Sequence, residues 1–327
     1  MDSVPVPSGT IVTVFGGAGF LGRHTVRALA RAGYRIRVAV RKPNAAYFLM
    51  PMGHVGQIQP VRCDATDAGQ VAAALVGAHA AINLTGILYP HAGHSFAGVH
   101  VEGATNIARA ARKAGVSSLV HVSSIGADPD APSTYASTKG EGERRVREEY
   151  PEAAILRPSL LFGPEDNFFN KFASLARFFP ALPLIGGGHT RFQPVFVGDV
   201  ASAILSCIEK PEARGKTFEL GGPTVYSFKE LLEYILRETG RRRLLVPVPW
   251  LLASIKAFFL QMSAILGIEP LLTVDQVRLL RTDNVVHEGM ATMADLGIAP
   301  VALEAIVPSY LWRFRAKGQY QVMATGS

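Results

Sequence analysis

The stretch "TVFGGAGFLGRHTVRAL" (residues 13–29) decides the fold, because glycines join a short apolar strand to a helix there. The β-branched run "IVTVF" (11–15) is typical of a buried parallel strand. Gly16, Gly19 and Gly22 allow a tight turn, close approach of the backbone to a pyrophosphate, and close packing of the helix on the sheet. The N-terminus of the helix then offers free N–H groups to the phosphates. We therefore predict a dinucleotide site at these glycines.

Further apolar runs alternate with helical segments along the first half of the chain. We expect strands at 35–40, 57–64, 80–86, 118–124 and 153–158, and helices near 67–76, at 99–114 and around Tyr135. This alternation predicts an α/β fold: a Rossmann-type, doubly wound parallel sheet with a smaller, mostly C-terminal α/β lobe. Residues 1–160, completed by parts of 190–225, should form the dinucleotide-binding domain, and 161–327 the smaller lobe.

The composition suits a globular protein with anionic partners. Of 327 residues, 48% are hydrophobic and 18% charged, which is enough for a sizeable core. The net charge of +7 suits ligands with phosphate groups, anionic membrane surfaces or acidic proteins. No Lys/Arg block is interleaved with aromatic residues, so we do not expect a nucleic-acid partner.

Cysteines and histidines show no metal-site pattern. Cys63 and Cys207 are far apart in apolar surroundings, which predicts a reducing compartment and no disulfide. His91, His94 and His100 cluster in a Gly-rich segment without a supporting carboxylate, so a loop is expected there and no metal. Only ten residues precede the first strand, and they lack a basic run and an apolar core. We therefore expect no targeting segment, and either a bacterial, cytoplasmic protein or a mature product, of which the Met1 start favours the first.

The residues after the second predicted strand discriminate between the two nicotinamide dinucleotides. An acidic residue there would bind the ribose 2′-hydroxyl of NAD, but this chain has Arg41 and Lys42. Two cations suit a 2′-phosphate, so the expected cofactor is NADPH. Arg23 would add a third cation, and Phe20 and Leu21 complete the expected contacts of the glycine turn.

Asp64 follows the third predicted strand and is placed to meet the adenine. The alternative is that it caps the helix that begins near Asp67.

The sequence "STYASTK" (133–139) places Tyr135 and Lys139 four residues apart, which is one face of a helix. A Lys ammonium beside a phenol should lower the pKa of the Tyr. Such a Tyr can exchange a proton with a carbonyl or alcohol while a nicotinamide exchanges hydride. Ser124, at the end of the fifth predicted strand, is placed to hydrogen-bond the same oxygen.

The motifs "GGAGFLG", "HVSSIGA", "YASTK" and "LRPSLLFGPED" occur in the order typical of the extended and atypical short-chain dehydrogenase/reductase superfamily, which this chain resembles. The resemblance implies that Ser124, Tyr135 and Lys139 match the catalytic trio of the superfamily. It also implies that Pro158 lies near the nicotinamide.

Three later stretches, 157–201, 279–286 and 307–320, resemble the NAD(P)H-binding accessory subunit of respiratory complex I in its alphaproteobacterial form. The resemblance runs from about Ile11 to Tyr320. It implies a structural NADPH, other complex I subunits as partners, and a peripheral place on the cytoplasmic face of the bacterial inner membrane. The trio is intact, so it could bind the nicotinamide ribose or turn over. The alternative is a free-standing reductase, epimerase or dehydratase acting on a sugar nucleotide, sterol or lipid-like carbonyl.

The most apolar stretch is 247–272. Its large apolar residues are predicted to share one helical face: Leu251, Ile255, Phe258, Phe259, Met262 and Leu266. Two interpretations stay open, a core or lid helix of the smaller lobe and an interfacial helix against lipid or a hydrophobic subunit, with Trp250 at the interface. The aromatic, basic tail at 309–320 either docks to a partner or packs across its own domain.

Overall fold

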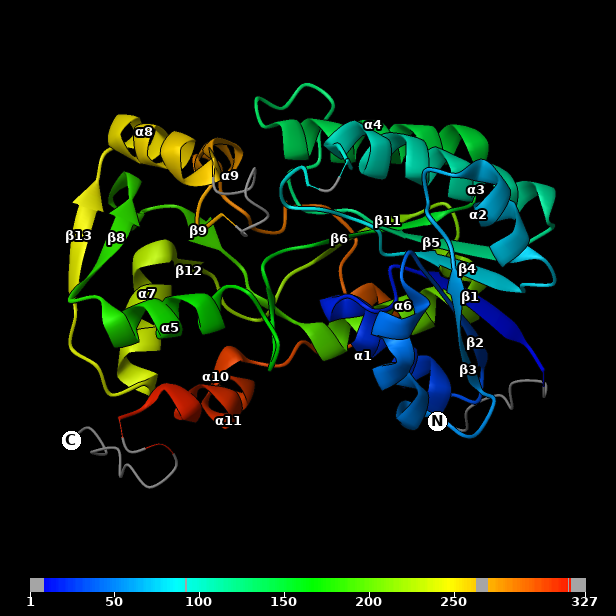
Figure 1. Cartoon of the computed structure of the whole chain (residues 1–327), viewed down its shortest axis with the longest axis horizontal. Coiled ribbons are helices and arrows are strands. Elements are labelled where there is room, and N and C mark those ends of the chain that lie inside the picture. Colours follow the sequence, from blue (N-terminus) through cyan, green and yellow to red (C-terminus); the bar gives the residue numbers. More distant parts are fainter. Residues whose placement is uncertain (1–8, 92, 263–269, 317, 319–327) are drawn as a thin grey trace. The chain divides into compact units, whose positions relative to one another are not determined.

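The chain divides into two compact units. The computed structural model describes residues 9–91, 93–262, 270–316 and 318. The first unit comprises 1–158, 198–220 and 287–299, and the second comprises 159–197, 221–286 and 300–327 (Figure 1). Segment 287–299, which we expected in the C-terminal lobe, therefore belongs to the first unit. A parallel bridge between Phe218 and Ala291 explains this placement.

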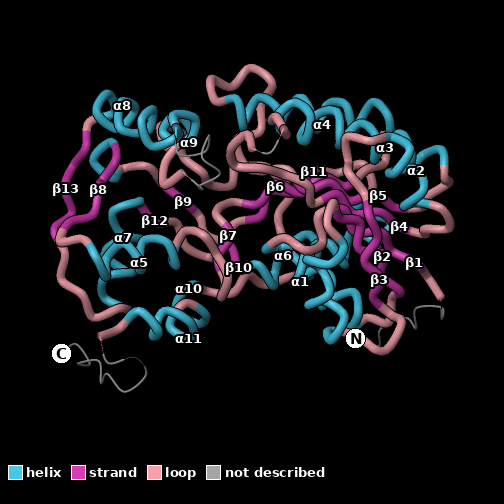
Figure 2. Tube along the Cα trace, in the orientation of Figure 1, coloured by secondary structure: helices cyan, strands magenta, loops and turns pink. Residues whose placement is uncertain are grey.

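A seven-stranded parallel sheet forms the centre of the first unit, with the strand order β11-β6-β5-β4-β1-β2-β3 (Figure 2). The strands are β1 (Ile11–Phe15), β2 (Arg35–Val40), β3 (Ile58–Arg62), β4 (Ala80–Asn83), β5 (Ser118–Val122), β6 (Ala154–Pro158) and β11 (Thr217–Leu220). The order reverses between β1 and β4, and ligands bind at the carboxyl ends of the strands beside such a switch point. The predicted α/β fold is confirmed.

Helices flank the sheet of the first unit. They are α1 (Phe20–Arg31), η1 (Pro43–Met52), α2 (Ala68–Leu75), the π-helical turn η2 (Ala97–Gly103), α3 (Ala104–Lys113), α4 (Thr134–Glu149), α6 (Val197–Glu209), η4 (Pro211–Ala213) and η6 (Ala294–Leu296). Leu75 of α2 and Ile107 of α3 are buried with Leu119 of β5 in one apolar cluster. The periodic apolar residues of these helices therefore cover the sheet, as the sequence pattern predicts.

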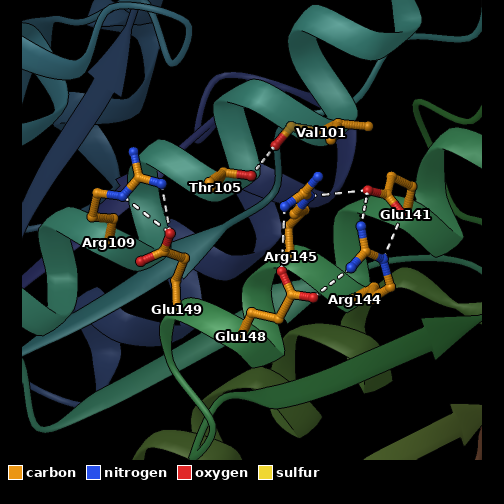
Figure 3. A network of polar contacts seen from close by, with 8 residues as sticks. All are labelled: Val101, Thr105, Arg109, Glu141, Arg144, Arg145, Glu148 and Glu149. Atoms are coloured by element: carbon orange, nitrogen blue, oxygen red, sulfur yellow. Dashed lines mark hydrogen bonds and ion pairs between the residues drawn. The ribbon is translucent and has the colours of Figure 1, made fainter.

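The outer face of α4 bears a network of ion pairs (Figure 3). Arg144 donates to Glu141 and Glu148, and Arg145 donates to Glu141 from the next position. A further pair, from Arg109 of α3 to Glu149 with an N···O distance of 2.6 Å, joins the two helices. Exposed pairs of this kind contribute little to stability, so the network mainly keeps this face solvated.

The second unit consists of short strand pairs and helices. Its strands are β7 (Leu161–Phe162), β8 (Ala181–Ile185), β9 (Arg191–Phe192), β10 (Val195–Phe196), β12 (Tyr226–Ser227) and β13 (Leu244–Val248). Its helices are α5 (Phe169–Phe178), η3 (Gly186–Gly188), α7 (Phe228–Glu238), α8 (Trp250–Gln261), α9 (Val274–Leu279), α10 (Leu303–Ile306), α11 (Pro308–Leu311) and η7 (Trp312–Phe314). Ser227 and Glu230 form a capping box at the start of α7.

The described part of the tail packs on its own unit. The Tyr310 hydroxyl donates to the buried Asp166 carboxylate at 2.5 Å, and Arg315 Nε donates to the Glu238 carbonyl at 2.8 Å. Lys317 and residues 319–320 of the expected docking tail lie outside the described residues.

Helix α8 buries its small residues and exposes its large ones. Ala253 and Ala257 are buried, whereas Leu251 is 71% and Phe259 66% exposed. Ile255, Phe258 and Met262 are also exposed, and Leu266 lies outside the described residues. The core-helix interpretation is therefore wrong for the described part of this face. In the part of the chain that the structure covers, no helix has the length and apolar character to span a membrane.

Candidate functional site

The glycine turn between β1 and α1 has the shape of a phosphate cradle. Gly16 has φ +78°, and a Cβ there would lie 3.0 Å from the Leu84 carbonyl carbon. A Cβ at Gly22 would lie 2.5 Å from the backbone of Gly16 and Gly17, so close packing of the turn requires both glycines. Gly19 is exposed, and a Cβ there would meet only the Gly16 carbonyl, at 3.3 Å. Gly16 and Gly22 are therefore needed for the packing of the turn, whereas the space beside Gly19 is free, which fits a bound pyrophosphate.

The first turn of α1 continues this cradle. The Arg23 N–H donates to the Gly19 carbonyl at 3.1 Å, which is the first i to i−4 hydrogen bond of α1. The N–H groups before it lie at the helix N-terminus, where anions are stabilised. The Leu21 side chain is buried in the core and that of Phe20 is half-buried. Leu21 can therefore face a ligand only through its backbone.

The predicted 2′-phosphate cations lie where β2 ends. Arg41 and Lys42 are exposed and directly follow this strand. The Arg23 guanidinium lies 5.0 Å from the centre of the Phe48 ring of η1.

Asp64 shares this edge with Arg41. Burial raises the pKa of Asp64, but hydrogen bonds from Thr66 and the charges of His94 and Arg41 outweigh burial, so the net pKa is lowered. Asp64 accepts from Thr66 N and Oγ1 at 3.0 and 2.8 Å. It does not cap α2, because Asp67 does so, accepting from Gly69 N and Gln70 N. The capping alternative for Asp64 is therefore wrong. His94 Nε2 lies 3.8 Å from Asp64 Oδ2, so this histidine does have a carboxylate nearby, contrary to expectation.

The predicted trio lies just after β5 and on α4. Ser124 is the second residue after the end of β5, and Tyr135 and Lys139 lie on α4, which Ser133 caps by accepting from Ala136 N at 3.3 Å. Lys139 is 5% exposed, and its Nζ donates to the Val122 carbonyl at 3.2 Å. Burial lowers the pKa of Lys139 to about 8, against the opposing charge of Glu143.

The pKa of Tyr135 is raised by burial, and its hydrogen bond with Ser124 offsets only part of that rise. This direction contradicts the expectation that Lys139 lowers the pKa of the phenol. The physical reason is that desolvation of the phenolate dominates, while the Lys139 ammonium donates to a backbone carbonyl.

His100 is a site residue that the sequence interpretation placed in a loop. It lies on η2, its Nε2 accepts from Ile87 N at 3.1 Å, and its Nδ1 lies 3.0 Å from Thr138 Oγ1. Its ring meets that of Tyr135 edge-on at 5.4 Å. Burial and the Lys139 charge lower the pKa of His100 to about 2, so it stays neutral and fixes the loop after β4. The position of His100 inside the predicted helical segment 99–114 could have indicated that it lies on a helix and not in a loop.

A buried ion network begins one turn after Lys139. Arg157 donates to both carboxylate oxygens of Glu143, at 2.9 and 2.7 Å, and its Nη1 lies 3.5 Å from Glu219. Glu219 Oε2 accepts from the backbone N of His287 and lies 2.8 Å from its Nδ1. The neighbouring Pro158 ends β6, and its carbonyl accepts from Ile125 N at 3.1 Å. This network fixes β6 and β11 to the helix of the trio.

The predicted residues therefore gather at the carboxyl ends of the parallel strands in the first unit. The glycine turn follows β1, the cations follow β2, Ser124 follows β5, and Pro158 ends β6. This edge is where dinucleotides bind in doubly wound sheets.

Known proteins resemble this chain in sequence and in fold. The sequence profile of the NAD dependent epimerase/dehydratase family matches residues 12–221. The mitochondrial NADH dehydrogenase [ubiquinone] 1 alpha subcomplex subunit 9 of Arabidopsis thaliana is 34% identical, over 95% of this chain and 79% of its own length. A ceramide reductase of Caulobacter vibrioides is 33% identical over 62% of each chain.

Among solved structures, a nucleoside-diphosphate-sugar epimerase from Staphylococcus aureus has a TM-score of 0.71 at 16% identity, covering 92% of this chain and 99% of its own. That likeness concerns the fold alone. The profile match and the near-full-length relative go further. The chain belongs to the NAD dependent epimerase/dehydratase family, in the branch that contains the mitochondrial NADH dehydrogenase [ubiquinone] 1 alpha subcomplex subunit 9.

Proposed function

We propose that this chain is an accessory subunit of a respiratory NADH:ubiquinone oxidoreductase, in which it holds NADPH as a structural element and stabilises the peripheral arm near the membrane. The observation that supports this most is the 34% identity to subunit 9 over 95% of the chain. This sequence similarity to subunit 9 extends through the second unit, whereas the match to the family profile ends at residue 221. The proposed location is peripheral, on the cytoplasmic face of a bacterial inner membrane.

The arrangement of charges favours NADPH over NADH. Arg41 and Lys42 stand where NAD-binding members would place a carboxylate, and Arg23 lies on the neighbouring helix. Gly16, Gly19 and Gly22 would hold the pyrophosphate, with Phe20 and Leu21 contributing the helix N-terminus. Asp64 would meet the adenine, and Pro158 would line the nicotinamide end.

The Tyr135–Lys139 pair suits binding of the nicotinamide ribose. A raised phenol pKa keeps Tyr135 protonated at neutral pH, so it can donate a hydrogen bond to the ribose but is a poor base. Lys139, with a pKa of about 8, supplies ammonium donors to the same sugar. The bound dinucleotide would supply hydride chemistry only if a substrate reached it.

Helix α8 is the proposed contact with the membrane region. Its exposed Leu251, Phe258 and Phe259 form an apolar surface of the kind that lies against lipid or a hydrophobic subunit.

The test is a charge reversal, Arg41→Glu, with Lys113→Glu at the exposed end of α3 as the control. We expect Arg41→Glu to reduce the NADPH that copurifies with the chain by at least about tenfold, since it replaces an attractive charge with a repulsive one. The amount of assembled complex, measured by native gel with NADH:quinone activity staining, should fall with it. Normal assembly of a nucleotide-free variant would refute the structural-cofactor proposal.

A second candidate function is reduction of a lipid-like carbonyl, for which the ceramide reductase relative is the specific observation. Ser124, Tyr135 and Lys139 would then be catalytic, with Tyr135 donating its proton to the carbonyl oxygen. Tyr135→Phe discriminates between the two candidates. A reductase loses turnover of offered carbonyls by a factor of about 10² or more. The proposed subunit loses one hydrogen bond to the ribose but keeps its assembly.

A further inference from the structure

The segment η1 in the first unit exposes a cluster of large apolar side chains. The η1 face comprises Tyr47, Phe48 and Met50 of this segment and Val55, three residues after its end, each at least 44% exposed. The fully buried Ala46 and Leu49 of the same segment fix it to the core. An exposed cluster of aromatic and aliphatic side chains on one segment is a feature of interaction sites.

This segment is rigidly attached at its far end. Gln57 Nε2 donates to the carbonyls of Ala30 and Tyr34, at 2.8 and 3.0 Å, and its Oε1 accepts from His54 N at 2.8 Å. The buried amide of Gln57 therefore ties the chain after η1 to the end of α1. The apolar side chains are presented by a held segment, so less conformational entropy is lost when a partner covers them.

The net charge of the chain lies in the part of the sequence that contains this face. Of 33 Lys and Arg and 26 Asp and Glu, residues 1–63 contain eight and one respectively, which leaves 25 of each sign in residues 64–327. The net charge of +7 therefore belongs wholly to the first 63 residues.

Several of these cations lie at the two ends of η1. Lys42 directly precedes it, and Arg23 stacks on Phe48. At the far end, the exposed Arg31 and Arg35 flank the residues that Gln57 holds. Two carboxylates face this region from other elements: Asp64 interacts with Arg41, and Glu209 hydrogen-bonds Tyr34.

NADPH accounts for only part of this pattern. Its phosphates would engage Arg23, Arg41 and Lys42, but Arg31 and Arg35 lie at the opposite end of β2 from that site. The dinucleotide also gives no reason for Tyr47 and Met50 to be exposed. A second anionic partner with an apolar centre accounts for both observations.

We propose that the η1 face is a docking surface for another polypeptide whose contact region is apolar with an acidic rim. Aromatic residues, Met and Arg are the types enriched in protein interfaces, and seven of the eight cations are Arg. A membrane surface fits less well, because η1 has only ten residues, contains Pro51 and lacks the long apolar face of an interfacial helix. The inference rests on the proposed function only for the assignment of Arg23, Arg41 and Lys42 to NADPH.

The test is site-specific photo-crosslinking of the full chain in native membranes. Tyr47→p-benzoylphenylalanine reports on the face, and the same substitution at the fully exposed Val55 is a second position should the first disturb folding. The exposed Val76, at the end of α2, is the control. We expect one discrete protein adduct from each face position, at a peptide where acidic residues outnumber basic ones, and no such adduct from the control. The double variant Arg31→Glu, Arg35→Glu should lower its yield about tenfold at low salt.

Other outcomes overturn the proposal. Adducts with the mass of a lipid would assign the face to the membrane. The absence of an adduct at both positions would refute the docking surface. An adduct yield that the charge reversal does not change would refute the acidic rim of the partner. Copurified NADPH and comigration with NADH:quinone activity are measured in the same preparation. A chain that retains both but does not crosslink refutes only this inference, and a crosslinked chain that lacks both refutes only the proposed function.

Discussion

Among single residues, Lys139 shows that a site residue can lower the stability of the folded state. Its pKa is lowered from 10.5 to about 8 by burial, so the unfolded chain binds the proton more strongly than the folded one. The folded state is therefore penalised in full below pH 8, and the penalty disappears as the pH rises to 10.5. A ligand that pairs with the ammonium would offset this penalty, which is consistent with a tightly held cofactor.

We predict that Lys139→Met raises the melting temperature of the nucleotide-free protein at pH 7, by removing the buried charge. The gain should shrink between pH 8 and 10.5, where the wild-type amine has lost its proton in the folded state but still holds it in the unfolded state, and the electrostatic part should be gone above pH 10.5. Thermal unfolding followed by circular dichroism at several pH values measures it, with the exposed Lys113→Met as the control. A gain that does not change with pH would assign the effect to packing.

The same residues show what a sequence can and cannot predict. The i, i+4 spacing places Tyr135 and Lys139 on one helix face, and the structure agrees. The predicted direction of the shift in the Tyr135 pKa was wrong, because desolvation of the phenol depends on which other segments cover the ring. His100 was missed for the same reason, since its partners Ile87 and Thr138 come from two other segments.

At the scale of elements, the glycine turn permits a sharp distinction between folding and binding. Gly22→Ala places a Cβ 2.5 Å from two backbone positions, whereas Gly19→Ala meets only one carbonyl at 3.3 Å, and Gly19 has an ordinary φ of −72°. We predict that Gly22→Ala lowers the melting temperature strongly. Gly19→Ala should leave it within about 2 °C and weaken NADPH binding by an order of magnitude or more, since the methyl group occupies the pyrophosphate path. Calorimetric titration and thermal unfolding of both variants test this pairing, which fails if Gly19→Ala binds normally.

Most elements of the first unit were predictable because their apolar runs are short and regularly spaced. β1 and β2 occupy the predicted residues, whereas β3, β4 and β5 end two or three residues early, at their last paired residue. The return of segment 287–299 to the first unit was not predictable, because its bridge to Phe218 joins residues more than seventy positions apart. Sequence periodicity reports local faces and carries no information about such pairings.

At the scale of the whole molecule, the exposed face of α8 predicts how the chain associates. Fully burying a large apolar side chain is worth roughly 2 kcal/mol, so losing two should weaken attachment by an order of magnitude or more. We predict that Leu251→Ser with Phe258→Ser releases the chain from native membranes into the soluble fraction while leaving its melting temperature unchanged, because both residues are exposed. Quantitative immunoblotting of the fractions measures this, with the exposed pair Val76→Ser and Val225→Ser as the control. Equal retention of both double variants would exclude α8 from the contact.

The separation of charge along the chain also determines how the molecule behaves in an electric field. The sequence isoelectric point near 9.5 is a property of residues 1–63, and a fragment beginning at residue 64 would focus near neutrality. A cation-exchange resin would retain the chain mainly through residues 1–63. Its retention would be stronger than that of a chain with the same net charge of +7 spread evenly along the sequence. An anionic surface would attract residues 1–63, which carry the whole net charge, more strongly than the electrically balanced remainder of the chain.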